Sequence, residues 1–220
     1  LYREIEWSYT LLTAAEQCLF VSLATFVGGC DSEAVQVLCA AGDTQDNILN
    51  TMEGLTRKNL VIHDTCGSRS RFRMLETIQE FARTKLRVYD DQDLLRWQHA
   101  RYYLDWSRKS QDKLHGPDQI EWIDRIEEEF GNLDSAIEWF LERKDFRSAQ
   151  EMCVALTWYW YRSGRTTYGG KRLQETLTDS GATGPIRAHA LRSLGWMQFT
   201  RGEWKTAAAT MKCGWRLSFS

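Results

Sequence analysis

The sequence predicts a mainly α-helical protein with one small β-hairpin. Apolar residues recur at spacings of three and four along most of the 220 residues, which is the spacing of amphipathic helices. Only two prolines interrupt the chain. The segment 60–74 is different, because β-prone residues flank a cluster of turn residues.

The hairpin is followed directly by a helix. Leu60–Asp64 is a short β-prone run, Cys66–Ser70 is rich in turn residues, and Arg71–Met74 is extended. No breaker separates Met74 from a helical pattern that includes Ile78, Phe81 and Ala82. Helices, a two-stranded wing and another helix, here ending near Val88, follow the order of a winged-helix domain.

Capping residues define the helices of the first half. Thr13 and Glu16 form the pattern of a capping box, in which each side chain accepts from the other residue's backbone amide. Gly28–Gly29 is expected to end that helix. Asp31 and Thr44 are expected to cap the third and fourth helices.

The second half predicts one helix after another. A long helix is expected to run to about Leu114, Asp118 to cap the next, and a turn at Gly131–Asn132 to begin another. Two helix pairs then follow. Their expected ranges are Phe146–Arg162 with Thr166–Thr178, and Pro185–Thr200 with Glu203–Leu217.

The two pairs resemble a tetratricopeptide repeat. Leu194, Gly195, Gly202, Trp204 and Ala207 match that pattern, in which small residues let antiparallel helices approach closely. In the first pair, Gly164 and Gly169 take the corresponding places. We therefore expect an irregular helical-repeat array, whose last helix another repeat would normally cover.

These patterns predict three parts. Residues 1–90 are expected to form a winged-helix domain, residues 91–144 a helical linker bundle, and residues 145–220 tetratricopeptide-like helical repeats. The chain begins at Leu1 rather than at a methionine. We therefore expect it to be part of a longer parent protein.

Composition excludes several classes. The 30 acidic and 28 basic residues give a net charge of -2, so DNA binding would require a local basic patch. The six cysteines form no C-x-x-C pair and are typical of small buried side chains in a reducing cytoplasm. No apolar run reaches the roughly 18 residues that a membrane helix needs. We expect a cytoplasmic protein without a metal site.

Three segments carry a resemblance. The opening I-E-W-S-Y-T-L-L-T-A-A-E-Q-C-L-F-V-S-L-A-T-F-V-G-G resembles the start of the winged-helix domain in STAND ATPases, a signal-transducing class of P-loop proteins. The stretch R-F-R-M-L-E-T-I-Q-E-F-A is similar to the end of that domain, especially in bacterial transcriptional regulators of the LuxR and AfsR type. The stretch G-P-D-Q-I-E-W-I-D-R-I-E-E-E-F-G-N-L-D-S-A-I-E-W resembles the segment after the winged helix in the same bacterial regulators.

The resemblance implies a parent protein that binds ATP or ADP with magnesium in a separate nucleotide-binding domain. That domain would be one partner of this chain. A protein or small-molecule signal on the helical repeats would be another, and DNA would bind through a separate domain. No cofactor is expected in the chain itself.

The nucleotide sensor of that family is altered here. The strand-to-helix junction often reads Met-His-Asp in the family, and its histidine contacts the β-phosphate of ADP. The matching residues are Met74, Leu75 and Glu76, and leucine can neither donate a proton nor carry a charge. Glu76 is expected in the first turn of its helix, where the helix dipole favours a carboxylate. The arginines at 69, 71 and 73 either replace the phosphate contact or form a solvated face of the wing.

No catalytic motif is present. The sequence lacks G-x-x-x-x-G-K-[ST], a strand-flanked G-x-G-x-x-G, G-x-S-x-G and H-E-x-x-H. An enzyme acting through Glu76, His63 or His99 is the weakest alternative, and His99 is better explained as a hydrogen-bonded core residue. Glu127–Glu129 is expected to be a solvated face rather than a metal site.

Aromatic residues are the candidates for partner binding. Trp158-Tyr159-Trp160-Tyr161 is apolar all round its helix, which favours core packing. Some of these rings could instead lie on the surface where helical arrays bind partners. The partner-binding candidates are Trp158, Tyr161, Trp196 and Trp204.

The expected function is therefore a non-catalytic regulatory and protein-interaction segment of a STAND ATPase, a bacterial transcriptional regulator. The alternative is a free-standing winged-helix DNA-binding protein with a helical dimerisation or effector domain. Against this alternative, the presumptive recognition helix 45–58 carries Asp46 and Glu53 beside only Arg57 and Lys58.

Overall fold

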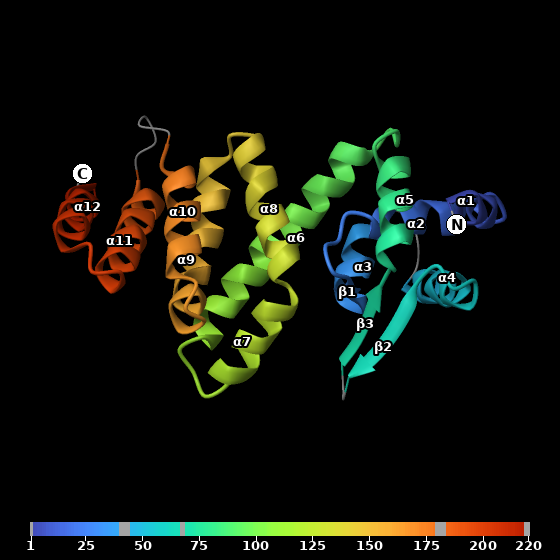
Figure 1. Cartoon of the computed structure of the whole chain (residues 1–220), viewed down its shortest axis with the longest axis horizontal. Helices are drawn as coiled ribbons and strands as arrows, with labels where there is room; N and C mark the ends of the chain where they lie inside the picture. The colour runs from blue at the N-terminus through green and yellow to red at the C-terminus, as the bar shows by residue number, and fades with distance from the viewer. Residues whose placement is uncertain (1, 40–44, 67–68, 179–183, 218–220) are drawn as a thin grey trace. The chain divides into compact units, whose positions relative to one another are not determined.

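The computed structural model describes residues 2–39, 45–66, 69–178 and 184–217 (Figure 1). It is mainly helical and contains a small three-stranded antiparallel sheet, so the predicted fold class is confirmed. The chain forms two compact units, Leu1–Tyr102 and Tyr103–Ser220. The division falls inside helix α6 (Gln92–Lys113). The division into 1–90, 91–144 and 145–220 stays a prediction.

The first unit packs helices around one aromatic cluster. The rings of Tyr9, Phe20 and Phe81 meet with centroid distances of 5.5 Å from Tyr9 to Phe20 and 5.7 Å from Tyr9 to Phe81. Phe20 and Phe81 are fully buried. Besides the start of α6, the elements are α1 (Tyr2–Thr10), α2 (Ala14–Leu23), β1 (Cys30–Asp31), α3 (Ser32–Cys39), α4 (Gln45–Arg57), β2 (Ile62–Cys66), β3 (Arg69–Arg73) and α5 (Glu76–Leu86).

The sheet contains one strand more than the predicted hairpin. Its order is β1-β3-β2, and Phe72 of β3 stands opposite both Cys30 and His63. A side chain at Gly29 (φ 98°) would place its Cβ 2.5 Å from the carbonyl oxygen of Phe72. Glycine therefore allows the chain to approach β3 closely enough for β1 to pair.

The capping predictions in this unit have mixed outcomes. Thr13 and Glu16 form the predicted capping box, and the Ala34 amide donates to the Asp31 carboxylate at 2.8 Å. Helix α2 ends at Leu23, well before Gly28, so the prediction that Gly28–Gly29 ends it was wrong. The amides of Ala24, Thr25 and Phe26 each bond to the carbonyl oxygen three residues earlier, as in a 3₁₀ turn. Thr44 lies outside the described residues.

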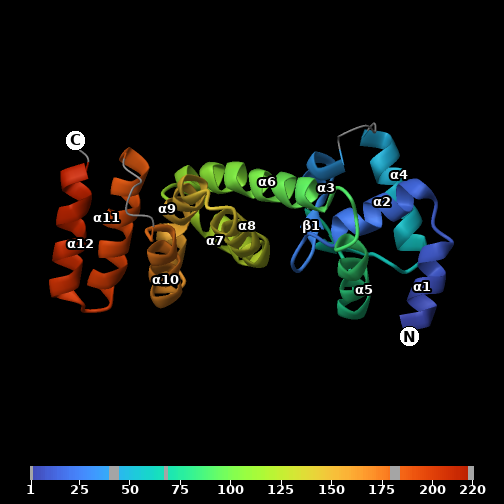
Figure 2. The same ribbon diagram turned by 90° about the horizontal axis from the view of Figure 1, so that it is seen from above.

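The second unit places its helices side by side. Figures 1 and 2 show α11 and α12 as neighbours, and α10 lies next to both α9 and α11. Besides the end of α6, the elements are α7 (Gln119–Glu128), α8 (Phe130–Glu142), α9 (Phe146–Arg162), α10 (Thr166–Thr176), α11 (Pro185–Thr200) and α12 (Trp204–Leu217).

Two local predictions in this unit were wrong. Asp118 precedes α7 but makes no capping hydrogen bond, because its carboxylate pairs with Lys113 at 3.3 Å. Gly131–Asn132 is not a turn, since both residues lie inside α8. Asn132 is fully buried there and donates to Glu129, which holds it within the helix.

One turn geometry recurs in this unit. Lys144, Gly164 and Gly202 follow α8, α9 and α11, with positive φ angles of 59°, 73° and 80°. After each of them an amide bonds back to the carbonyl oxygen five residues earlier, as in a Schellman motif. These bonds are Asp145 to Phe140 (2.8 Å), Arg165 to Trp160 (2.8 Å) and Glu203 to Gln198 (3.0 Å). The same turn therefore sends successive helices back along their neighbours.

Candidate partner-binding site

A continuous series of aromatic rings crosses the second unit. We call the rings of His115, Trp158, Tyr161, Trp196, Phe199 and Trp204 the aromatic row. Successive centroid distances along it are 5.0, 5.4, 5.7, 5.9 and 4.9 Å. Each is within the range in which aromatic pairs attract one another. The row therefore links α9, α11 and the first residue of α12.

Helix geometry brings these rings together. Trp158 and Tyr161 are three residues apart on α9, and Trp196 and Phe199 are three apart on α11, so each pair shares one helix face. The Tyr161 ring meets the Trp196 ring edge-on and joins the two faces. Phe199 and His115 were not among the sequence candidates. The spacing of Phe199 from Trp196 was the signal that could have identified it.

The middle and end of the row face solvent. The exposed fractions are 38% for Tyr161, 36% for Trp196, 45% for Phe199 and 60% for Trp204. Trp158 is only half-buried, but its indole Nε1 is buried and has no hydrogen-bond partner among the described residues. Exposed aromatic side chains arranged contiguously are typical of a surface that binds a protein partner.

The neighbouring rings of α9 anchor that surface. Tyr159 is fully buried and Trp160 is 1% exposed, so the two middle rings of the four-ring cluster lie in the core and the two outer rings belong to the row. A Cβ on Gly169 would lie 2.4 Å from the Trp160 ring. The ring therefore packs directly on the backbone of α10, which fixes the orientation of α9.

The three glutamates at 127–129 form the expected solvated face only in part. Glu127 and Glu128 are exposed, and Glu127 also bonds to Tyr159 and Arg165. Glu129 is 7% exposed and accepts from the Tyr103 hydroxyl (2.7 Å) and the Asn132 amide (2.6 Å). The prediction was wrong for Glu129, because Tyr103 lies on another helix and a local charge pattern cannot reveal it.

A second carboxylate–tyrosine–arginine group braces α8 against α10. Asp134 accepts from the Tyr168 hydroxyl and pairs with Arg172 at 2.5 Å. Burial raises the pKa of Tyr168, and its hydrogen bond to Asp134 raises it further. Tyr168 is therefore a neutral hydrogen-bond donor at physiological pH.

The segment that resembles the nucleotide sensor of STAND ATPases lies in the first unit. Leu75 precedes α5 in an extended conformation and is 48% exposed. Glu76 is exposed in the first turn of α5, where the dipole favours it, but the helix has no side-chain cap. Leu75, the residue that the resemblance aligns with that sensor, is thus an apolar side chain on the surface.

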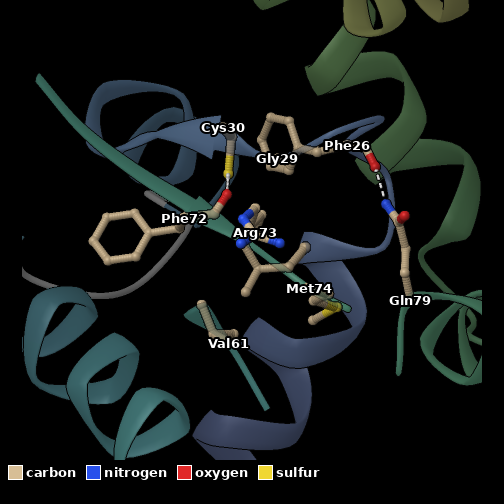
Figure 3. Close-up of a pocket in the computed structure, with 9 residues that line it drawn as sticks. Phe26, Gly29, Cys30, Val61, Phe72, Arg73, Met74 and Gln79 are labelled. Carbon is tan, nitrogen blue, oxygen red and sulfur yellow. Dashed lines mark hydrogen bonds between the residues drawn. The ribbon is translucent and has the colours of Figure 1, made fainter. Parts of the chain in front are cut away.

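A small cavity lies beside this junction (Figure 3). Phe26, Phe72 and Met74 line it, and Gln79 closes one side by donating to the Phe26 carbonyl oxygen at 2.5 Å. Its volume is about 10 Å³, which is about the space that one water molecule requires. The cavity is far too small for a nucleotide.

The wing arginines are engaged within the unit. Arg71 donates to the Gly29 carbonyl oxygen at 3.2 Å, and Arg73 pairs with Asp64 at 2.5 Å. The side chain of Arg69 lies outside the described residues. His63 stacks on Phe72 at 4.6 Å, and His99 is 3% exposed and meets Phe26 edge-on at 5.3 Å. These contacts give Arg71, Arg73 and both histidines a structural role within the first unit.

Comparisons with known proteins point to one group of relatives. The chain is 32% identical, over 196 residues, to proteins named provisionally as HTH-type transcriptional regulators. They are Mb0914c of Mycobacterium bovis and MT0914 and Rv0890c of two Mycobacterium tuberculosis strains. The match includes 85% of this chain and spans 22% of the length of those relatives. Neither a protein-family model nor a solved structure matches the chain.

Among the residues that the structure describes, no three His, Cys, Asp or Glu side chains gather closely enough to hold a metal ion. None of the helices described is both long and apolar enough to cross a membrane.

Proposed function

We propose that this chain is a non-catalytic regulatory and protein-interaction segment of a larger bacterial transcriptional regulator of the STAND ATPase class. The aromatic row carries the interaction part of the proposal, because it is a solvent-facing surface built on two adjacent helices. The names of the mycobacterial relatives support a role in transcription. The relatives' greater length leaves room for a nucleotide-binding domain and a separate DNA-binding domain.

The proposed mechanism is a two-state switch in the cytoplasm. In the resting state the first unit packs on the parent's nucleotide-binding domain, which holds ADP and magnesium. A signal that binds the row more tightly in the active state shifts the equilibrium toward that state. Because Leu75 cannot contact a phosphate, this segment contributes to the switch by packing and not by sensing the nucleotide directly.

The test uses the intact protein in its host. Deleting the gene first identifies the transcripts that depend on the protein. These transcripts are then measured in strains that carry the wild type, the double variant Tyr161→Ala/Trp196→Ala, or Trp97→Ala. Trp97 is a matched control, because it is 47% exposed and lies on α6 outside the row. We expect the double variant to lose the transcripts that deletion loses, while Trp97→Ala retains them. A double variant that is as abundant and as active as wild type refutes the proposal.

The second candidate is direct DNA binding by the first unit, which the relatives' HTH designation favours. Helix α4 offers exposed Arg57 but also exposed Glu53. Fluorescence anisotropy of a labelled duplex DNA with this chain distinguishes the two. Binding that weakens steeply with salt and is lost in Arg57→Ala supports the second candidate. Our proposal predicts no such binding.

A further inference from the structure

The charge of the chain is divided unevenly along its length. Residues 146–220, which include α9 to α12, hold eleven basic and four acidic residues, a net charge of +7. Residues 1–145 hold 17 basic and 26 acidic residues, a net charge of -9. The aromatic row is therefore built mostly on the basic part of an overall acidic chain.

The acidic side chains that the structure describes between residues 146 and 217 are already paired. Glu151 pairs with Arg108 and Arg147, and Glu203 pairs with Arg201. Glu175 pairs with Lys171 and Arg172. An approaching ligand therefore meets few free carboxylates on these helices.

Two basic side chains remain available beside the row. Arg162 lies one helical turn after Trp158 and next to Tyr161, and Lys205 follows Trp204 directly. Both are exposed, and neither forms an ion pair with any residue that the structure describes. The exposed rings are thus accompanied by free positive charge in α9 and in α12.

We propose that the aromatic row binds an acidic, amphipathic peptide segment of a partner protein. Apolar side chains of the segment would pack on Trp196 and Phe199, and its carboxylates would pair with Arg162 and Lys205. The inference rests on the proposed function of the row as a docking surface. It adds the chemistry of the partner.

The rings and the charges have different roles in this arrangement. Exposed ion pairs contribute little affinity, whereas aromatic side chains dominate most interfaces. Charge complementarity instead selects the partner and accelerates association. We therefore expect Trp196→Ala to weaken binding by roughly tenfold or more, and Arg162→Glu/Lys205→Glu to weaken it selectively for acidic ligands.

The test is fluorescence anisotropy of the full chain with three labelled peptides. They share Leu and Phe positions and carry Glu, Ser or Lys between them. We expect the Glu peptide to bind most tightly, the Lys peptide least, and added salt to reduce the difference. Arg162→Glu/Lys205→Glu should weaken the Glu peptide alone. Lys109→Glu is the matched control, because Lys109 is also exposed but lies on α6 outside the row.

Each contrary result has a distinct meaning. If the Glu and Ser peptides bind equally well and Trp196→Ala abolishes the binding of both, the acidic partner is overturned but the docking surface stands. If Trp196→Ala changes the binding of none of the three peptides, both the acidic partner and the docking surface are overturned. A labelled single-stranded DNA that binds more tightly than the Glu peptide, through Trp196, overturns the acidic partner in favour of nucleic acid.

Discussion

The close contact between α9 and α10 gives a quantitative prediction for Gly169→Ala. The new Cβ would lie 2.4 Å from Cε3 and 2.6 Å from Cδ2 of Trp160, whereas carbon atoms in contact prefer about 3.5–4.0 Å. Trp160 is a rigid ring and only 1% exposed, so the ring or the helix must move by about 1 Å. Overpacking of this kind costs about 1–3 kcal/mol, and the better helix propensity of alanine returns about 1 kcal/mol.

We therefore expect Gly169→Ala to lower the free energy of unfolding by up to about 2 kcal/mol, measured by urea denaturation with circular dichroism. Gly195→Ala is the control. Its Cβ would meet Cγ of Met211 at 2.5 Å, and this flexible side chain can turn away, so the loss should be smaller. Replacing the ring with a smaller side chain in Trp160→Leu should remove most of the destabilisation that Gly169→Ala causes. A Gly169→Ala protein that is more stable than wild type refutes the predicted contact.

Three further predictions concern the first unit. Burial alone would raise the pKa of Glu16, but its hydrogen bonds with Lys58 and Thr13 lower it overall. Its stabilising contribution is therefore present above its ordinary pKa and is lost as pH falls through the lowered value. Glu16→Gln should lower the free energy of unfolding by about 1–2 kcal/mol at neutral pH. In urea titrations at several pH values, the variant should also lose less stability than wild type as pH falls. The hydrogen bond to Cys18, followed by burial, raises the pKa of Tyr89 to about 12. The neutral Tyr89 hydroxyl therefore stabilises the fold at pH values below its ordinary pKa of 10.0, and this contribution is lost as pH rises through about 12. Cys18→Ala should return the pKa of Tyr89 toward 10.0 in a spectrophotometric titration. Glu76→Ala should change unfolding free energy by less than about 1 kcal/mol, since it loses only a helix-dipole interaction; a larger loss would reveal a further role for this carboxylate.

Local sequence patterns predicted part of the local structure. The Thr13 capping box depends on two side chains three residues apart, and α9 has the bounds Phe146–Arg162 that its apolar pattern predicts. Strand β1 was not predicted, because two residues carry no periodic pattern and pair only with the distant β3. Lys144 adopts the same turn as Gly164 without a glycine to mark it.

The candidate site was predictable only in part. Trp158, Tyr161, Trp196 and Trp204 were chosen as aromatic residues on repeat helices, but their order in space depends on how α9 lies against α11. That contact joins Tyr161 to Trp196 across 35 positions of sequence. The ion pairs of Glu127 and Glu151 likewise join distant helices. These pairings leave the row accompanied mainly by free basic side chains.

Nucleotide binding separates the proposed STAND-type switch from other regulators. Isothermal titration calorimetry with ADP and magnesium can be carried out on the intact parent protein and on this chain alone. We predict that ADP binds the intact protein and does not bind the isolated chain. An intact protein that fails to bind ADP, or an isolated chain that binds it, would overturn the proposed function.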